Sequence, residues 1–117
     1  MSLSPPGVRL FYDPRGHHAG AINELSWGLE EQGVPCQTIT YDGGGDAAAL
    51  GALAARSSPL RVGIGLSASG EIALTHAQLP ADAPLATGHV TDSDDHLRTL
   101  GANAGQLVKV LPLSERN

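Results

Sequence analysis

Hydrophobic positions follow first a strand period and then a helix period along the start of the chain. VRLFYD (8–13) and CQTITYD (36–42) are short runs rich in β-branched and aromatic residues, which predict two strands. Between them Ile22, Leu25 and Leu29 recur at the spacing of one helix face. The pattern therefore predicts a strand, a helix and a second strand.

Turn and capping residues mark the limits of two helices. Gly33 is placed to take the left-handed conformation after the first helix, and Pro35 forbids that helix to continue. Asp46 is placed to cap a second helix, which RSSP (56–59) ends. The apolar positions of the second helix share one face: Leu50, Leu53 and Ala54. Both helices should therefore pack on a sheet through one apolar side.

Three further runs predict strands. LRVGIGLS (60–67) is almost wholly apolar, as is typical of a central strand that helices cover on both faces. EIALTHAQL (71–79) follows after only ASG, and so short a link cannot form a parallel crossover. The two runs therefore predict an antiparallel hairpin. PLATGHV (84–90) predicts a fifth strand.

The last part of the chain carries a helical stripe. It lies within DSDDHLRTLGANAGQLVKV (92–110), and its apolar members are Leu97, Leu100, Ala104, Leu107 and Val108. Glycine is a poor helix former, so Gly101 and Gly105 are expected to break this helix into two pieces.

The order of these elements predicts an α/β fold with three layers. Helices should cover both faces of a mixed five-stranded sheet, and right-handed crossovers fix the first three strands. The expected strand order is 2-1-3-4-5, with strand 4 antiparallel. With 117 residues and no break in composition, the whole chain (1–117) is expected to form a single domain.

Charge and composition exclude several classes of function. Twelve acidic and seven basic side chains give a net charge of -5, and no basic stripe exists to bind nucleic acid. Cys36 is the only cysteine, which rules out an internal disulfide framework. No charged-then-apolar leader follows Met1, and the longest uncharged apolar run, within 63–70, cannot span a bilayer. We therefore expect a cytoplasmic protein with no membrane partner, and leave open its association with a bacterial microcompartment.

Three features that resemble ligand sites have ordinary explanations. GGGD (43–46) precedes a helix, but it lacks the lysine of a P-loop and Asp46 would repel phosphate, so a flexible turn is favoured. Cys36 follows a proline on a strand, which favours a small buried side chain over a reactive thiolate. The histidines lack the spacing of a zinc site and are expected to be surface or structural: His17, His18, His76, His89 and His96.

A nucleophile–base set is also conceivable from the sequence. Ser67 or Ser69 could combine with His76 and Asp82. GLSASG (65–70), however, departs from the G-x-S-x-G nucleophile elbow at both serines. The sequence therefore favours a hairpin turn of small residues here.

Two adjacent carboxylates, Glu30 and Glu31, stand in GLEEQGVP (28–35) just before a predicted helix end. An acidic side chain in the last turn costs about 0.3–1 kcal/mol, because the helix dipole is negative there. One explanation is a solvated last turn that tolerates this small cost. The other is that one carboxylate binds a hard cation such as Mg2+, whose remaining oxygens come from a partner.

Four stretches, taken together, resemble one family. They occur in a fixed order at similar separations: GLEEQGVP (28–35), AARSSPLRVGIG (54–65), LPADAPL (79–85) and GANAGQLVKVLPL (101–113). From Gly28 to Leu113 the chain resembles the small subunit of the diol and glycerol dehydratase reactivating factors. FYDPRGHHAG (11–20) departs from the more aliphatic and acidic start of that family.

The resemblance implies a chaperone-like role and no catalysis by this chain. In that family a large subunit with an Hsp70-like domain binds and hydrolyses ATP. The small subunit looks like the β subunit of the adenosylcobalamin-dependent dehydratase and is thought to exchange with it, which lets damaged cobalamin leave. The implied partners are therefore the large ATPase subunit and the large subunit of the dehydratase.

The resemblance also implies a site. A glutamate at the position of Glu31 is a ligand of the divalent cation, Mg2+, at the junction with the large subunit, and Glu30 would lie in the same interface. Arg56 either anchors that interface or has a purely structural role. The alternative from another class is a stand-alone α/β enzyme or nucleotide-binding domain, whose ligand would lie at the strand C-terminal loops formed by GGGD (43–46) and GLSASG (65–70).

Overall fold

The computed structural model describes residues 6–16 and 18–110. Its elements, in chain order, are β1 (Val8–Tyr12), α1 (Ala19–Glu31), β2 (Cys36–Thr40), α2 (Ala47–Ser57), β3 (Val62–Leu66), β4 (Glu71–His76), β5 (Ala86–His89) and α3 (Asp94–Val110). Among these helices none is long and apolar enough to cross a membrane.

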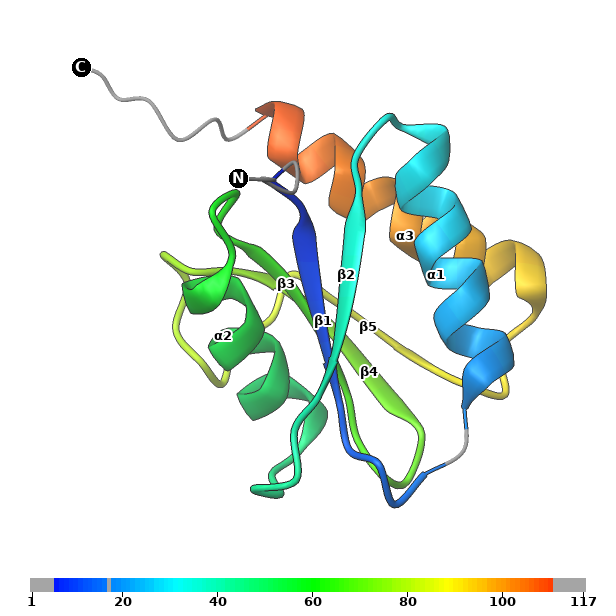
Figure 1. Cartoon of the computed structure of the whole chain (residues 1–117), viewed down its shortest axis with the longest axis vertical. Coiled ribbons are helices and arrows are strands. Elements are labelled where there is room, and N and C mark those ends of the chain that lie inside the picture. The colour runs from blue at the N-terminus through cyan, green and yellow to red at the C-terminus, as the bar shows by residue number, and fades with distance from the viewer. Residues whose placement is uncertain (1–5, 17, 111–117) are drawn as a thin grey trace, which may run out of the picture.

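The strands form one mixed sheet in the order β2-β1-β3-β4-β5, as predicted. β1 pairs in parallel with both β2 and β3, whereas β4 is antiparallel to β3 and to β5. Helices α1 and α3 cover one face of the sheet and α2 covers the other (Figure 1). The predicted three-layer α/β architecture is therefore confirmed.

The central strand β3 shows how the sequence distinguishes the two faces of the sheet. Val62, Ile64 and Leu66 are fully buried in the core that α1 and α3 cover. The intervening Gly63 and Gly65 lie beneath α2, where a Cβ atom would stand 2.2 Å from the Ala55 nitrogen and 2.1 Å from the Ala47 oxygen respectively. The alternation of large and small residues thus lets α2 approach the sheet backbone closely.

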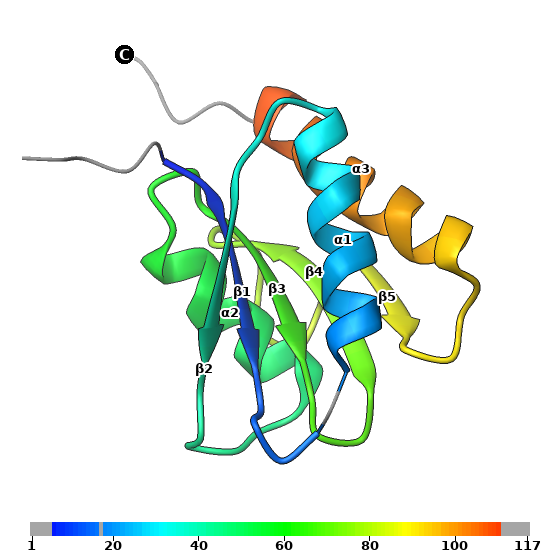
Figure 2. The same cartoon turned by 45° about the vertical axis from the view of Figure 1, so that its right-hand side comes forward.

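The closing helix α3 corrects one expectation. It runs unbroken from Asp94 to Val110, so Gly101 and Gly105 do not divide it. A Cβ atom on Gly101 would lie 2.1 Å from the Leu25 carbonyl oxygen, and one on Gly28 would lie 2.0 Å from the Arg98 carbonyl oxygen. Glycine permits α1 and α3 to pack backbone against backbone, and this packing offsets its low helix propensity of about 1 kcal/mol. Figure 2 shows the two helices side by side.

Several strands are shorter than their apolar runs. The run 60–67 becomes Val62–Leu66 because Arg61 adopts a left-handed backbone conformation, with φ 64°, in the turn that precedes the strand. The run 71–79 ends at His76, since residues 77 and 78 form a turn. Local turn geometry therefore sets these limits.

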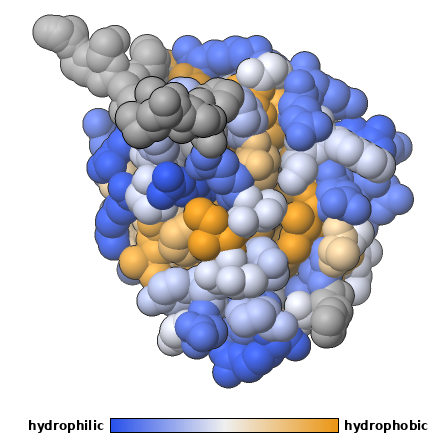
Figure 3. Space-filling model, in the orientation of Figure 1, coloured by the Kyte–Doolittle hydropathy of each residue, from blue (hydrophilic) through white to orange (hydrophobic). Residues whose placement is uncertain are grey.

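The sheet has two ends that differ in what lies there. Helices α1 and α2 both finish where strands β2 and β3 begin, which we call the N-terminal edge. The loops that follow β1 and β3 lie at the opposite, C-terminal edge, where open α/β sheets place their ligands. Hydrophilic side chains occupy most of the rim in Figure 3, and hydrophobic ones gather in its middle.

Candidate functional site

Helix α1 ends at the N-terminal edge in a Schellman motif. Gly33 takes the predicted left-handed conformation, with φ 75°. Its N–H donates to the Glu30 carbonyl oxygen at 2.9 Å, and the Val34 N–H donates to the Leu29 carbonyl oxygen at 3.1 Å. The last turn holds no basic residue. Glu31, the last helical residue, therefore exposes its carboxylate at the negative end of the helix dipole without compensation from α1.

Glu31 lines a surface hollow of about 360 Å³ between α1 and α3. We call it the α1–α3 hollow; its other lining residues are Asp95, Arg98, Thr99 and Ala102. Within the described residues Glu31 makes no ion pair. Its oxygens, the Asp95 carboxylate and the Thr99 hydroxyl are hard donors that suit Mg2+, which uses one or two protein carboxylates.

The α1–α3 hollow is at most a partial metal site. In the part of the chain that the structure describes, no group of three or more His, Cys, Asp or Glu side chains is placed to hold a metal ion. Mg2+ requires octahedral coordination by six oxygens. Water and a partner chain would therefore have to supply most of them.

Arg98, which lines the hollow, forms a cluster with Glu24 and Trp27 of α1. The Nε and Nη2 atoms of Arg98 both donate to Oε1 of Glu24, at 3.0 and 2.8 Å. The guanidinium also lies over the Trp27 ring, 5.6 Å from its centroid. Glu24 is buried, while Trp27 is 50% exposed. The buried carboxylate thus fixes a cationic side chain against an exposed aromatic ring.

The carboxylates around Arg98 all raise its pKa. The pKa of Arg98 is raised, first by its hydrogen bond to Glu24 and further by the charges of Glu24, Glu31 and Asp95. Glu31 is thus close enough to influence Arg98, although the two side chains do not form an ion pair. The guanidinium remains protonated in this position.

Glu30 points to a different part of the surface from Glu31. Its charge acts on Cys36 of β2, whose pKa is raised first by burial and further by Glu30, against a lowering hydrogen bond from Ser26. Cys36 is half-buried and packs against the core. A raised pKa leaves little thiolate, which agrees with the predicted unreactive side chain.

Arg56 lies in the last turn of α2, on the other face of the sheet. Its side chain is exposed, and its carbonyl oxygen accepts a hydrogen bond from Nη1 of Arg61 at 3.0 Å. Arg56 and Glu31 therefore share the N-terminal edge but approach it from opposite sides. The structure does not bring the two into contact.

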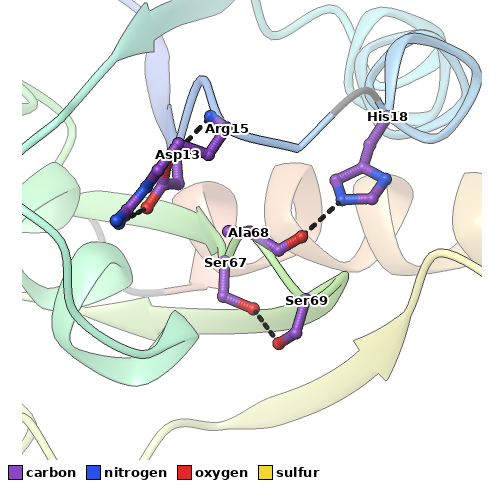
Figure 4. A network of polar contacts seen from close by, with 6 residues as sticks. All are labelled: Asp13, Arg15, His18, Ser67, Ala68 and Ser69. Carbon is purple, nitrogen blue, oxygen red and sulfur yellow. Dashed lines mark hydrogen bonds and ion pairs between the residues drawn. The ribbon is translucent and has the colours of Figure 1, made fainter.

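The C-terminal edge contains a second arginine–carboxylate pair (Figure 4). Asp13, directly after β1, is 2% exposed. Its Oδ1 accepts from the N–H and the Nε of Arg15, both at 2.9 Å, and its Oδ2 pairs with Nη2 of the same residue. The hydrogen bond from Arg15 is the main reason why the pKa of Asp13 falls to about 2.

Three more polar side chains of this edge, those of His18, Ser67 and Ser69, also have hydrogen-bond partners. Nε2 of His18 lies 3.2 Å from the Ala68 carbonyl oxygen, and the Ser67 and Ser69 hydroxyls are 3.0 Å apart (Figure 4). The Ser67 hydroxyl also accepts from the Glu71 N–H at 3.0 Å. This is the predicted hairpin turn, and its side chains are engaged in holding the turn.

The conceivable nucleophile–base set does not assemble. Ser67 follows β3 at the C-terminal edge, whereas His76 pairs with Val62 at the other end of the hairpin. His76 is buried, and its Nδ1 accepts from the Gln78 N–H at 3.1 Å. Burial, together with the charge of Arg61, lowers the pKa of His76. The histidine is therefore structural, as the sequence indicated.

The glycine-rich stretch 43–46 serves helix α2. Gly44 and Gly45 take positive φ angles, and Oδ1 of Asp46 accepts from the Ala49 N–H at 2.8 Å, which confirms the predicted cap. A hollow of about 340 Å³ lies beside it, with Asp46 and Glu71 both in its lining. Two carboxylates in one hollow disfavour a phosphate group.

Among the other histidines, His18 precedes α1, and His89 and His96 lie around the turn between β5 and α3. His17 lies outside the described residues. Nε2 of His96 lies 3.6 Å from Oδ2 of Asp92, which also accepts from the His89 N–H at 2.9 Å. These contacts hold together the turn between β5 and α3.

Sequence reasoning missed Glu24, Trp27 and Arg98. A signal existed on α1, because positions 24, 27 and 31 follow the spacing of one helix face, and Trp27 is the only tryptophan. The partner of Glu24 lies 74 residues away, at Arg98, and no local pattern indicates that pairing.

Comparisons with known proteins match this chain to subunits of dehydratases and of dehydratase-reactivating factors. A family model described as dehydratase medium subunit matches residues 5–114. A probable glycerol dehydratase-reactivating factor small subunit from Citrobacter freundii is 63% identical over 115 residues, which are 98% of each chain. A diol dehydratase-reactivating factor small subunit from Klebsiella michiganensis is 38% identical over 99 residues, covering 84% of this chain and 77% of that protein.

Two solved structures have the same fold. One, described as glycerol dehydratase reactivase, is 98% identical with a TM-score of 0.90, covering 97% of this chain and 100% of the other. The second is a diol dehydratase-reactivating factor complexed with ADP and Mg2+; the matched chain is 31% identical with a TM-score of 0.81, covering 96% of this chain and 100% of the other.

Proposed function

The chain belongs to the dehydratase medium subunit family, as a small subunit of the diol and glycerol dehydratase-reactivating factors, and we propose that it acts by docking and not by catalysis. Its first partner is the large Hsp70-like ATPase subunit of the factor. Its role is to help release damaged cobalamin from the adenosylcobalamin-dependent dehydratase. ATP binding and hydrolysis belong to the large subunit.

The exposed carboxylate of Glu31 is the observation that carries this proposal. It stands at the negative end of α1 with no ion-pair partner in the described residues, beside further oxygen donors on α3. A carboxylate in that position is stabilised once a cation binds it. We therefore assign Glu31 as a ligand of a Mg2+ ion whose other ligands come from water and the large subunit.

The rest of the N-terminal edge extends the proposed interface. Glu30 is exposed beside Glu31, and Arg56 reaches the same edge from the opposite face. A partner that covers this edge would contact all three side chains. Glu30 and Arg56 act through charge alone, so each contributes less than the ion-bridged Glu31.

Subunit exchange is supported by the shared fold. The family model that matches this chain describes dehydratase medium subunits. Two chains with one fold can present similar surfaces to the same large partner, so this subunit can take the place of its counterpart in the dehydratase. The vacated position would provide the exit for the damaged cofactor.

The alternative of a stand-alone enzyme or nucleotide-binding domain has less support. At the C-terminal edge Asp13 is paired with Arg15, and the serines of the hairpin hold its turn. Asp46 caps α2 and shares a hollow with Glu71, so it would repel phosphate. The related factor solved with ADP and Mg2+ supports a nucleotide in the factor as a whole, and we assign that nucleotide to the large subunit.

The test is a binding titration with the purified large subunit at increasing Mg2+. Glu31→Gln keeps the shape of the side chain but removes its charge, and should weaken association about tenfold or more. Glu30→Gln should have a smaller effect. Glu71→Gln, an exposed glutamate at the other edge, is the matched control and should bind like wild type.

A second assay tests the reaction. Cyanocobalamin-inactivated dehydratase is mixed with the large subunit, ATP and Mg2+, with or without this chain. Reactivation should require the chain, and Glu31→Gln should reduce it. Equal reactivation without the chain, or unchanged Mg2+-dependent binding by Glu31→Gln, would refute the proposal.

A further inference from the structure

Arg98 is the one basic residue among those that line the α1–α3 hollow with Glu31, yet it binds another carboxylate. Both side chains line the α1–α3 hollow. The guanidinium nevertheless directs its Nε and Nη2 atoms to a single oxygen of Glu24, at 3.0 and 2.8 Å, and stacks on Trp27. Its position is therefore fixed from two sides, by a buried acid and an aromatic ring.

An arginine that was free to move would compete with a metal ion for Glu31. Arginine forms bidentate pairs with carboxylates, and such pairing would occupy the same oxygens that coordinate Mg2+. Glu24 prevents this because it is buried and cannot follow the guanidinium outward. Its own carboxylate, if left without a partner, would be costly, so the pair with Arg98 is strongly favoured.

We propose that Glu24 is a positioning residue that holds Arg98 against Trp27 and away from Glu31, so that the Glu31 carboxylate stays available to the bridging cation. This inference rests on the proposed Mg2+ site at Glu31. It goes beyond that site by assigning the control of its cation affinity to residues that do not bind the ion.

The primary test is the Mg2+ concentration that gives half-maximal association with the large subunit. Glu24→Gln removes the charge that retains Arg98, which can then pair with Glu31. The midpoint should rise about two- to fivefold, the size of effect expected from an exposed ion pair. Adding Arg98→Gln to that variant removes the competing cation and should return the midpoint to the wild-type value or below.

A control and a second variant separate this role from mere stability. Gln106→Ala removes a different contact of α3, the 2.6 Å hydrogen bond to Gln32 directly after α1, and should leave the Mg2+ midpoint unchanged. Arg98→Lys keeps the charge but cannot reproduce the two-nitrogen contact with Glu24. It should raise the midpoint in the same direction, and since Arg98 is partly exposed the variant should fold. Thermal unfolding of each variant is measured in parallel.

The possible results distinguish a failure of the positioning role of Glu24 from a failure of the proposed Mg2+ site at Glu31. If Glu24→Gln lowers affinity equally at every Mg2+ concentration, or if Arg98→Gln does not restore the midpoint, then Glu24 is only structural and the inference is overturned. If wild-type association does not depend on Mg2+, the proposed site at Glu31 fails and the inference falls with it.

Discussion

Two arginine–carboxylate pairs lie in different surroundings, one at the C-terminal edge of the sheet and the other between helices α1 and α3. Asp13 and Arg15 are two residues apart and hold a local turn. The neighbouring serines and His18 also have hydrogen-bond partners within the chain. Glu24 and Arg98 join two helices across 74 residues. Beside that second pair, Glu31 has no ion-pair partner within the described residues.

In this molecule the edge of the sheet where α/β folds usually bind ligands is not the edge that we propose for docking. At the C-terminal edge Asp13, His18 and the two hairpin serines bind partners within the chain, so a ligand of these groups would have to replace existing bonds. At the N-terminal edge the last carboxylate of α1 has no ion-pair partner among residues 6–16 and 18–110, so a cation supplied by a partner would stabilise it. The first arrangement suits folding and the second suits docking.

The largest expected effect comes from disturbing the packing of α1 on α3, the two helices that form the α1–α3 hollow. Gly28→Ala would place a Cβ atom 2.0 Å from the Arg98 carbonyl oxygen and 2.6 Å from the Ala102 nitrogen, and backbone atoms cannot give way. We expect a loss of about 3 kcal/mol, the upper end of the usual range for overpacking, in the free energy of unfolding, measured by urea denaturation.

Gly20→Ala is the matched control on the same helix. Outside its own turn of the helix, no atom of the described residues lies within 4 Å of the added Cβ, so alanine should stabilise α1 by about 0.5 kcal/mol through helix propensity alone. Equal destabilisation by both substitutions would contradict the close backbone packing of α1 on α3.

A second, smaller effect tests whether the Asp13–Arg15 pair serves folding alone. Because the pKa of Asp13 is lowered to about 2, its pairing stabilises the fold above the ordinary carboxyl pKa of about 3.9 and is lost as pH falls through the folded value. Arg15→Ala should therefore be less stable than wild type near neutral pH. The difference should shrink between about pH 4 and pH 2.

Two measurements on Arg15→Ala check that prediction: urea denaturation at several pH values, and binding to the large subunit. Arg9→Ala is the control, because Arg9 pairs with the neutral Gln37 side chain at 3.0 Å and its loss should not vary with acid pH. Arg15→Ala should bind the large subunit like wild type. Weakened binding in a folded variant would remove the contrast between the two edges.

The sequence was sufficient for the fold because its signals are local. Gly33 ends α1, Asp46 caps α2 and the short ASG link requires a hairpin, and these three features order the strands. The predicted break of α3 at Gly101 was wrong, because helix propensity is a local property whereas the close contact of Gly101 with Leu25 is tertiary. Local reasoning therefore gave the topology but not the helix packing.

The candidate site could be predicted only in part. The acidic end of α1 is visible in the sequence, since Glu31 stands directly before the glycine and proline signals. The role of Arg98 is not, because only the crossing of α1 and α3 brings it to Glu24 and beside Glu31. A site that two distant helices form requires the fold before it can be recognised.

The smallest effect concerns the part of the N-terminal edge that lies on the α2 side of the sheet. Arg56 has an exposed side chain at the C-terminal end of α2, where its positive charge complements the helix dipole. If a partner covers the whole edge, Arg56→Gln should weaken binding about two- to threefold, more at low salt than at high salt, because exposed charges are screened. Arg56→Lys keeps the charge and should retain wild-type affinity. A binding titration at two salt concentrations measures both. Unchanged affinity of Arg56→Gln at low salt, with only a slightly less stable α2, would confine the interface to the α1–α3 side and leave Arg56 as a helix-capping charge.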